Sequence, residues 1–142
     1  MKIIVHELTA DGLTQTISVN KTANVEAIRP HLYRHQFPAG SLKLQVLTES
    51  DELVAESEPV VIADIMPESN FFHGNVRFDI NASLAKGSIY KVKLVGDGYS
   101  FSESAYVGWC NGYDLLNYEP DYLPESALNY PLSLQVWKRN PK

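Results

Sequence analysis

The sequence predicts an all-β fold, an antiparallel two-sheet β-sandwich of jelly-roll type with about eight or nine strands. Apolar and polar residues alternate at residues 76–80, the period of a strand with one face in a core and one in water. Tyr90, Val92 and Leu94 repeat this alternation. Turn signals recur about every 8 to 12 residues, and no segment has convincing helical periodicity.

Alternating runs and runs of Val and Ile predict the other strands. They cover residues 14–19, 42–46, 53–55, 59–65, 105–109 and 132–136. Residues 25–37 are ambiguous, because Val25, Ile28 and Leu32 have helical spacing whereas Pro30 would break a helix. We expect an irregular strand near a sheet edge there. Gly87 lets the chain turn back between the strands around residues 76–84 and 90–94.

Two segments differ from this alternation. Residues 1–8 are rich in Ile and Val, so we expect a strand or an N-terminal arm that packs on something else. Residues 111–130 lose all periodicity and contain Gly112, Pro120 and Pro124, which predicts a long aromatic and acidic loop. A loop of more than about 12 to 15 residues is either functional or contains a missed element.

The bulk composition is that of one globular domain, residues 1–142. The formal net charge of −5, with 17 acidic against 12 basic residues and no basic run, argues against nucleic acid or an anionic membrane surface as the main partner. No stretch approaches the roughly 20 apolar residues of a membrane span. Cys110 is the single cysteine and cannot form an internal disulfide. Residues 1–7 lack the features of a secretory signal peptide.

Several short segments, taken in their order along the chain, resemble a known family. They are residues 17–19, residues 28–33, residues 37–42 (Phe-Pro-Ala-Gly-Ser-Leu), Phe78 and residues 84–90 (Leu-Ala-Lys-Gly-Ser-Ile-Tyr). Across about residues 15–106 this order resembles the carbohydrate-binding-module-like jelly-roll domains of bacterial surface proteins and bacteriophage structural proteins. The resemblance implies a two-sheet sandwich with a binding or assembly role and brings no catalytic residues.

Surface members of this family usually have a signal peptide, further domains or an anchor, none of which is found in this sequence. We therefore expect a non-enzymatic virion protein, a head decoration or a tail or fibre component, made in the host cytoplasm. Its partners would be other virion proteins or copies of itself. The alternative is a carbohydrate-binding module that stacks loop aromatics on a glycan.

Aromatic residues provide the candidate binding site. Residues 99–130 contain six of the eight tyrosines together with Trp109 and several acids. Such side chains suit a protein interface or a sugar, because each has a rigid face and a polar tip. The candidates are Trp109, Tyr113, Asp114, Tyr118, Tyr122 and Trp137. In the simplest alternative, Tyr106 and Trp109 pack in the core and the other tyrosines cover an open end of the sandwich.

The terminal segments suggest assembly. Residues 2–5 are apolar on both faces and could pair with the sheet edge of a neighbour. Trp137 alternates with Leu134 and Val136, so it faces outward and needs a cover. We expect a subunit contact made by the N-terminal strand, the 111–130 loop and Trp137.

Catalytic and metal-binding patterns are weak. The acids of residues 114–125 could serve as paired carboxylates or bind a structural calcium ion, but no spacing fixes either chemistry. His31 and His35 share one face of a strand, although further zinc ligands are not evident. Cys110 has no surrounding signature of a nucleophile, so we expect a buried, inert thiol. The sequence therefore predicts neither a cofactor nor a resident metal.

Overall fold

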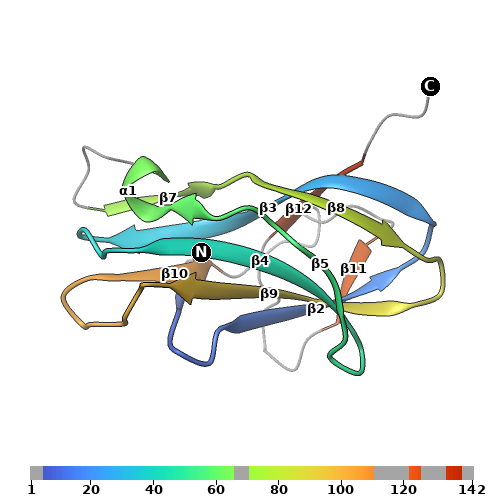
Figure 1. Ribbon diagram of the computed structural model, residues 1–142, viewed down its shortest axis with the longest axis horizontal. Helices are drawn as coiled ribbons and strands as arrows, with labels where there is room; N and C mark the ends of the chain where they lie inside the picture. The colour runs from blue at the N-terminus through green and yellow to red at the C-terminus, as the bar shows by residue number, and fades with distance from the viewer. Residues whose placement is uncertain (1–4, 66–70, 111–121, 126–133, 139–142) are drawn as a thin grey trace, which may run out of the picture.

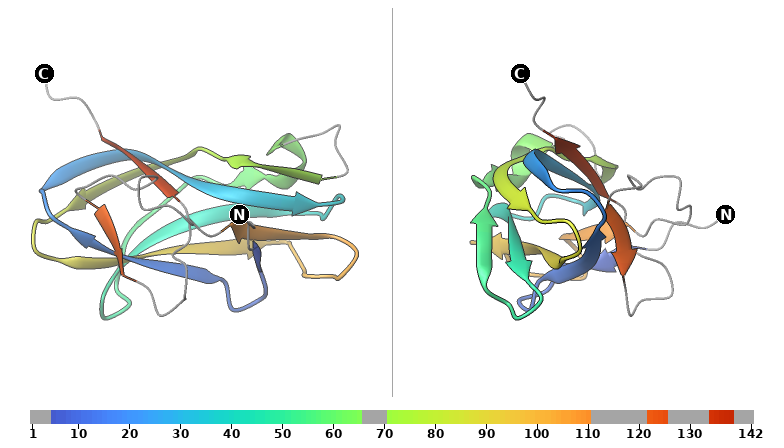
Figure 2. Two further views of the ribbon diagram at one scale, coloured as in Figure 1. Left: turned by 180° about the vertical axis from the view of Figure 1, so that it is seen from behind. Right: turned by 90° about the vertical axis from the view of Figure 1, so that its right-hand side faces the viewer.

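The computed structural model describes residues 5–65, 71–110, 122–125 and 134–138. These residues form two antiparallel β-sheets that pack face to face, which confirms the predicted two-sheet sandwich (Figure 1). The view along the long axis shows the two layers (Figure 2). Within the part of the chain described, no helix is long and apolar enough to cross a membrane.

Each sheet contains six of the described strands. The first sheet contains β1 (Val5–Glu7), β10 (Tyr106–Cys110), β3 (Ala23–His35), β12 (Leu134–Lys138), β7 (Phe71–Asn75) and β8 (Phe78–Leu84). The second contains β11 (Tyr122–Glu125), β2 (Leu13–Val19), β9 (Ile89–Asp97), β4 (Ser41–Thr48), β5 (Leu53–Glu56) and β6 (Val60–Val61). One helical turn, α1 (Ile62–Ile65), follows β6. The described strands outnumber the eight or nine expected because β7 and β11 were not predicted. The strand expected over residues 59–65 is wrong in its second half, where residues 62–65 form the helical turn α1.

Strand β3 is central to the first sheet, so the predicted edge position of this segment is wrong. One side of β3 pairs with β8 and then β7, and the other side pairs with β12 and then β10. Pro30 lies where β8 gives way to β7, and its carbonyl accepts a bond from the Val76 amide at 3.0 Å. In an antiparallel ladder the N–H and C=O of one residue serve the same neighbour. Pro30 therefore lacks a donor only at a junction between two partner strands.

The strands that first indicated the fold form the centre of the core, as predicted. In β8, Phe78, Ile80, Ala82 and Leu84 are buried while the residues between them are exposed. In β9 the buried positions include Tyr90, Val92 and Leu94. The two strands belong to different sheets, so the loop at Gly87 crosses from one layer to the other instead of closing a hairpin.

The predicted loop at residues 111–130 contains an element that the sequence did not reveal. Residues 122–125 form β11, which pairs with β2 in the register Tyr122↔Val19 to Glu125↔Thr16. Pro124 lies within this strand, and Pro is compatible with the edge of a sheet, where β11 lies in the strand order. The remaining residues of the predicted loop lie outside the described chain.

The N-terminal segment is a strand of its own sheet over Val5–Glu7, where it pairs with β10. This confirms the strand expected within residues 1–8, while residues 1–4 lie outside the described chain. The side chain of Val5 fills the space over Gly108, where a Cβ would lie 2.3 Å from the Val5 Cγ1. Gly108 therefore permits β1 to lie close against β10.

The side chain of Tyr99 connects the next residue pair after the β1–β10 ladder, Leu8 and Val107. The Leu8 amide donates to the Val107 carbonyl at 2.8 Å. The reverse bond is bridged by the Tyr99 hydroxyl, which accepts from the Val107 amide at 3.0 Å and donates to the Leu8 carbonyl at 2.9 Å. Leu8 and Val107 are both buried, so no water is at hand to replace this hydroxyl.

Tyr99→Phe should lower the free energy of unfolding by about 1–3 kcal/mol, because it leaves the buried Val107 amide without its acceptor. Chemical denaturation measures this loss. Tyr106→Phe is the matched control, since the Tyr106 hydroxyl forms no hydrogen bond within the described structure, and it should change stability by less than about 0.5 kcal/mol. Equal stabilities of the two variants would contradict the bridging role of Tyr99.

Candidate binding surfaces

Trp109 is not a surface residue, and its place among the binding candidates is therefore wrong. Its exposed fraction is 0%, and it packs in the hydrophobic core with Leu32 and Val107 among its cluster. The strand alternation explains this, because Val107 and Trp109 of β10 face the core while Tyr106 and Gly108 face the opposite side. The alternative in which Trp109 packs in the core is confirmed.

The other predicted candidates are only partly placed. Tyr113, Asp114 and Tyr118 lie outside the described residues. Tyr122 begins β11 opposite Val19, and Trp137 in β12 lies opposite Ala27. The two residues therefore belong to different sheets, Tyr122 to the second and Trp137 to the first.

Four rings form an aromatic cluster on the outer face of the first sheet. Its members are Tyr33, His35, Phe101 and Tyr106. The ring centroids of His35 and Tyr106 are 5.1 Å apart, and those of Phe101 and Tyr106 are 5.6 Å apart. Tyr33 completes the cluster, with its centroid 5.9 Å from that of Tyr106. Phe101 is exposed and the other three rings are half-buried, so the cluster presents aromatic surface to solvent.

Hydrogen bonding and burial fix the rings of this cluster. The Tyr33 hydroxyl lies 3.2 Å from Nδ1 of His35. Desolvation raises the pKa of the Tyr106 hydroxyl, and the nearby Tyr33 and Glu7 raise it further. The Tyr106 hydroxyl therefore stays protonated and uncharged at physiological pH.

The sequence indicated only half of this cluster. Strand alternation places Tyr33 on the same face of β3 as His35. Tyr106 was expected in the core only in the simplest alternative. The register Tyr106↔His35 between β10 and β3 brings the two segments together. That register depends on pairing between residues about 70 positions apart, which alternation alone does not reveal.

A second candidate surface is a groove between the two sheets. It runs between β5, at the edge of the second sheet, and β8, at the edge of the first, and has a volume of about 490 Å³. Figure 1 shows the positions of these two strands. Its apolar lining comes from Val54, Ala55 and Ile80. Its polar lining comes from Glu26, Glu56, Glu58, Arg77, Asp79 and Asn81. We call it the edge groove.

Acidic side chains dominate the edge groove. Asp79 accepts a charged bond from Arg77 at 2.7 Å, and Glu56 lies 3.6 Å from the Lys43 ammonium. Glu26 and Glu58 form no ion pair with any described residue. Four carboxylates therefore face one lining cation, Arg77.

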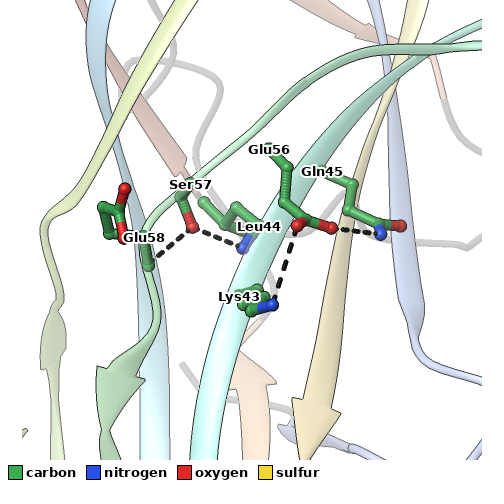
Figure 3. A network of polar contacts seen from close by, with 6 residues as sticks. All are labelled: Lys43, Leu44, Gln45, Glu56, Ser57 and Glu58. Carbon is green, nitrogen blue, oxygen red and sulfur yellow. Dashed lines mark hydrogen bonds and ion pairs between the residues drawn. The ribbon is translucent and has the colours of Figure 1, made fainter.

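Ser57 shapes the groove wall by joining β5 to β6 along β4 (Figure 3). The Ser57 amide donates to the Leu44 carbonyl at 2.8 Å, and the Ser57 hydroxyl accepts from the Leu44 amide at 2.9 Å. The same hydroxyl donates to the Glu58 carbonyl at 3.0 Å. The Ser57 hydroxyl thus takes the place of a backbone carbonyl as acceptor for the Leu44 amide, at the point between β5 and β6 where the edge strand is interrupted. The chain turns toward the groove at the next residue, Glu58.

Among the residues that the structure describes, Cys110, His31 and His35 do not come together as a site. Cys110 is buried, as expected, and desolvation raises the pKa of its thiol to about 11. His35 belongs to the aromatic cluster and His31 lies on the same strand face, in a central strand instead of at an edge. Across the described ranges, no group of three or more His, Cys, Asp or Glu residues is arranged to hold a metal ion.

No protein-family model matches this chain, and no curated protein sequence is significantly similar to it.

Ser57→Ala should lower the free energy of unfolding by about 1–3 kcal/mol, because the buried Leu44 amide loses its acceptor. Denaturant titration of purified protein measures the difference. Ser83→Ala is the control, since the Ser83 hydroxyl bonds only to the exposed Asn24 side chain. A Ser57→Ala variant as stable as Ser83→Ala would show that the hydroxyl does not hold the edge.

Glu56 makes stability depend on pH. The hydrogen bond from Gln45 and the nearby Lys43 lower the pKa of the Glu56 carboxyl from 4.5, although burial partly opposes this. A carboxyl whose pKa is lower in the folded state stabilises the fold above its unfolded pKa, and the effect disappears as the pH falls through the folded pKa.

Glu56→Gln should therefore lower stability at pH 7 by less than about 1 kcal/mol, and the difference from wild type should diminish as the pH falls below 4.5. Thermal melting across this pH range, with Glu49→Gln as the control, measures it. A difference that stays constant from pH 7 to pH 3 would contradict the role of the ionised carboxylate.

Proposed function

We propose that this chain is a non-enzymatic structural module of a bacteriophage particle, part of the head decoration, the tail or a fibre, that acts through protein–protein contacts. The particle assignment rests on the resemblance of residues 15–106 to jelly-roll domains of phage structural proteins. The two-sheet sandwich agrees with that resemblance without testing it.

The observation that best supports protein–protein contact is the apolar edge of the second sheet. Leu53 is 58% exposed, Val54 38% and Val61 47%, and all three lie on β5 and β6, which together form this edge. Apolar side chains gathered at a sheet edge and surrounded by polar residues are typical of an interaction surface. The charges of Lys43, Glu56 and Asp51 provide such polar surroundings.

A carbohydrate-binding role is the second candidate, and the aromatic cluster favours it. Tyr33, Phe101 and Tyr106 place ring faces and hydroxyls on the outer face of the first sheet, the combination that stacks on sugar rings. These residues take the place of Trp109, which is buried. The two candidate functions therefore use different surfaces, the β5–β6 edge and the aromatic cluster.

Charge placed on the apolar edge should disrupt assembly. The double variant Leu53→Asp, Val61→Asp should still fold, because both side chains are exposed. It should no longer be incorporated into purified particles, and in size-exclusion chromatography any oligomer should be reduced to the 15.9 kDa monomer. Circular dichroism verifies the fold of the double variant. Phe101→Ala is the matched control, because it removes an exposed apolar side chain from the other surface.

Unchanged incorporation of the double variant would contradict contact through the β5–β6 edge, and absence of the wild-type chain from particles would contradict the particle role. A glycan array distinguishes the second candidate. Glycan binding that is lost in Phe101→Ala and Tyr106→Ala, and kept in the edge variant, would replace the first function by the second.

A further inference from the structure

Strand β8 has an unpaired edge along the edge groove. One edge of β8 pairs with β3, and none of the strands described pairs with the other. The amides and carbonyls of such an edge can pair with a further strand. β8 spans seven residues with regular alternation and contains neither Pro nor Lys, the residues that commonly prevent such pairing. It is therefore suited to strand addition.

The opposite wall of the groove provides an apolar contact. Val54 is 38% exposed, and it lines the groove together with Ala55 and Ile80. An added strand points alternate side chains to opposite sides. Alternate apolar residues of such a strand could pack against this wall while the intervening residues meet the polar lining.

The acidic lining of the edge groove determines which side chains an added strand should place between its apolar residues. Arg77 already compensates Asp79, and Lys43 lies near Glu56. Glu26 and Glu58 remain without a cation among the described residues, on the two sides of the groove that β3 and the segment after β5 provide. A segment with Lys or Arg would neutralise them, whereas an acidic segment would be repelled.

We propose that the edge groove binds an extended segment of a partner protein in which Lys or Arg alternates with apolar residues, added as a strand to the free edge of β8. This names the chemistry of the partner for the protein–protein role proposed above and rests on that role. The segment receives backbone bonds from β8, apolar contact from Val54 and charge pairing from Glu26 and Glu58.

The test uses the purified chain and a synthetic probe, acetyl-Lys-Val-Lys-Val-Lys-amide, in titration calorimetry at low salt. The probe should bind, and Glu26→Gln with Glu58→Gln should weaken binding about fivefold or more. Glu103→Gln is the control, because this exposed carboxylate lies outside the groove and should leave the affinity unchanged. The peptide acetyl-Glu-Val-Glu-Val-Glu-amide should not bind.

Strand addition has its own readout. Methylation of alternate backbone nitrogens of the Lys-Val probe should abolish binding, and the unmodified probe should slow hydrogen exchange of β8 amides. Absence of binding by the Lys-Val probe at millimolar concentration, equal binding of the Glu-Val peptide, or equal binding of the methylated probe would each overturn the proposal. Incorporation into particles is measured separately on the β5–β6 edge variant, so failure of the peptide test and failure of the particle role are distinguishable.

Discussion

The two-sided pairing of β3 is the constraint on which the rest of the structure depends. Thirteen residues, Ala23–His35, pair with four strands, two in succession on each side. All four partner strands are distant from β3 in sequence, so their pairing with β3 fixes the relative positions of segments from most of the chain. The register also fixes which side chains of β3 face the core, such as Ile28 and Leu32, and which face outward, such as Tyr33 and His35.

Both candidate surfaces follow from this arrangement. β10 and β3 are neighbours in the first sheet, and their register brings Tyr106 beside Tyr33 and His35 on its outer face. Phe101, from the segment between β9 and β10, completes the aromatic cluster. On its other side β3 pairs with β8, and none of the described strands pairs with the far edge of β8, which lies along the groove. The bulge between Val25 and Ala27 lies in this same β3–β8 pairing, and Glu26 at the bulge lines the groove. Irregular pairing thus places a carboxylate where a regular ladder would not.

Local patterns predicted the elements well, because alternation reports burial on one face of a strand. Phe78, Ile80, Tyr90 and Val92 were all expected in the core and are buried. Pro30 misled the prediction for β3, since Pro usually marks an edge, and only the junction between β8 and β7 explains why it is tolerated inside the sheet. Residues 122–125 were hidden by Pro124 and by the acids around them, so β11 was missed.

The candidate sites were harder to predict than the fold, because they depend on register. Trp109 and Tyr106 are close in the sequence, but Trp109 faces the core and Tyr106 faces outward. Within a strand, residues separated by an odd number of positions point to opposite faces of the sheet. The sequence does not show which of the two faces the other sheet covers. The edge groove could not be predicted at all, because it arises where β5, which ends at Glu56, passes β8 of the other sheet.

Hydrogen exchange of the isolated chain tests most directly whether β3 organises the fold. If β3 is paired on both sides, its amides should exchange most slowly along the whole strand, whereas amides of β8 that face the groove should exchange quickly and those that face β3 slowly. Exchange of the β3 amides as fast as that of the turn at residues 49–52 would contradict the central position of this strand and the surfaces that depend on it.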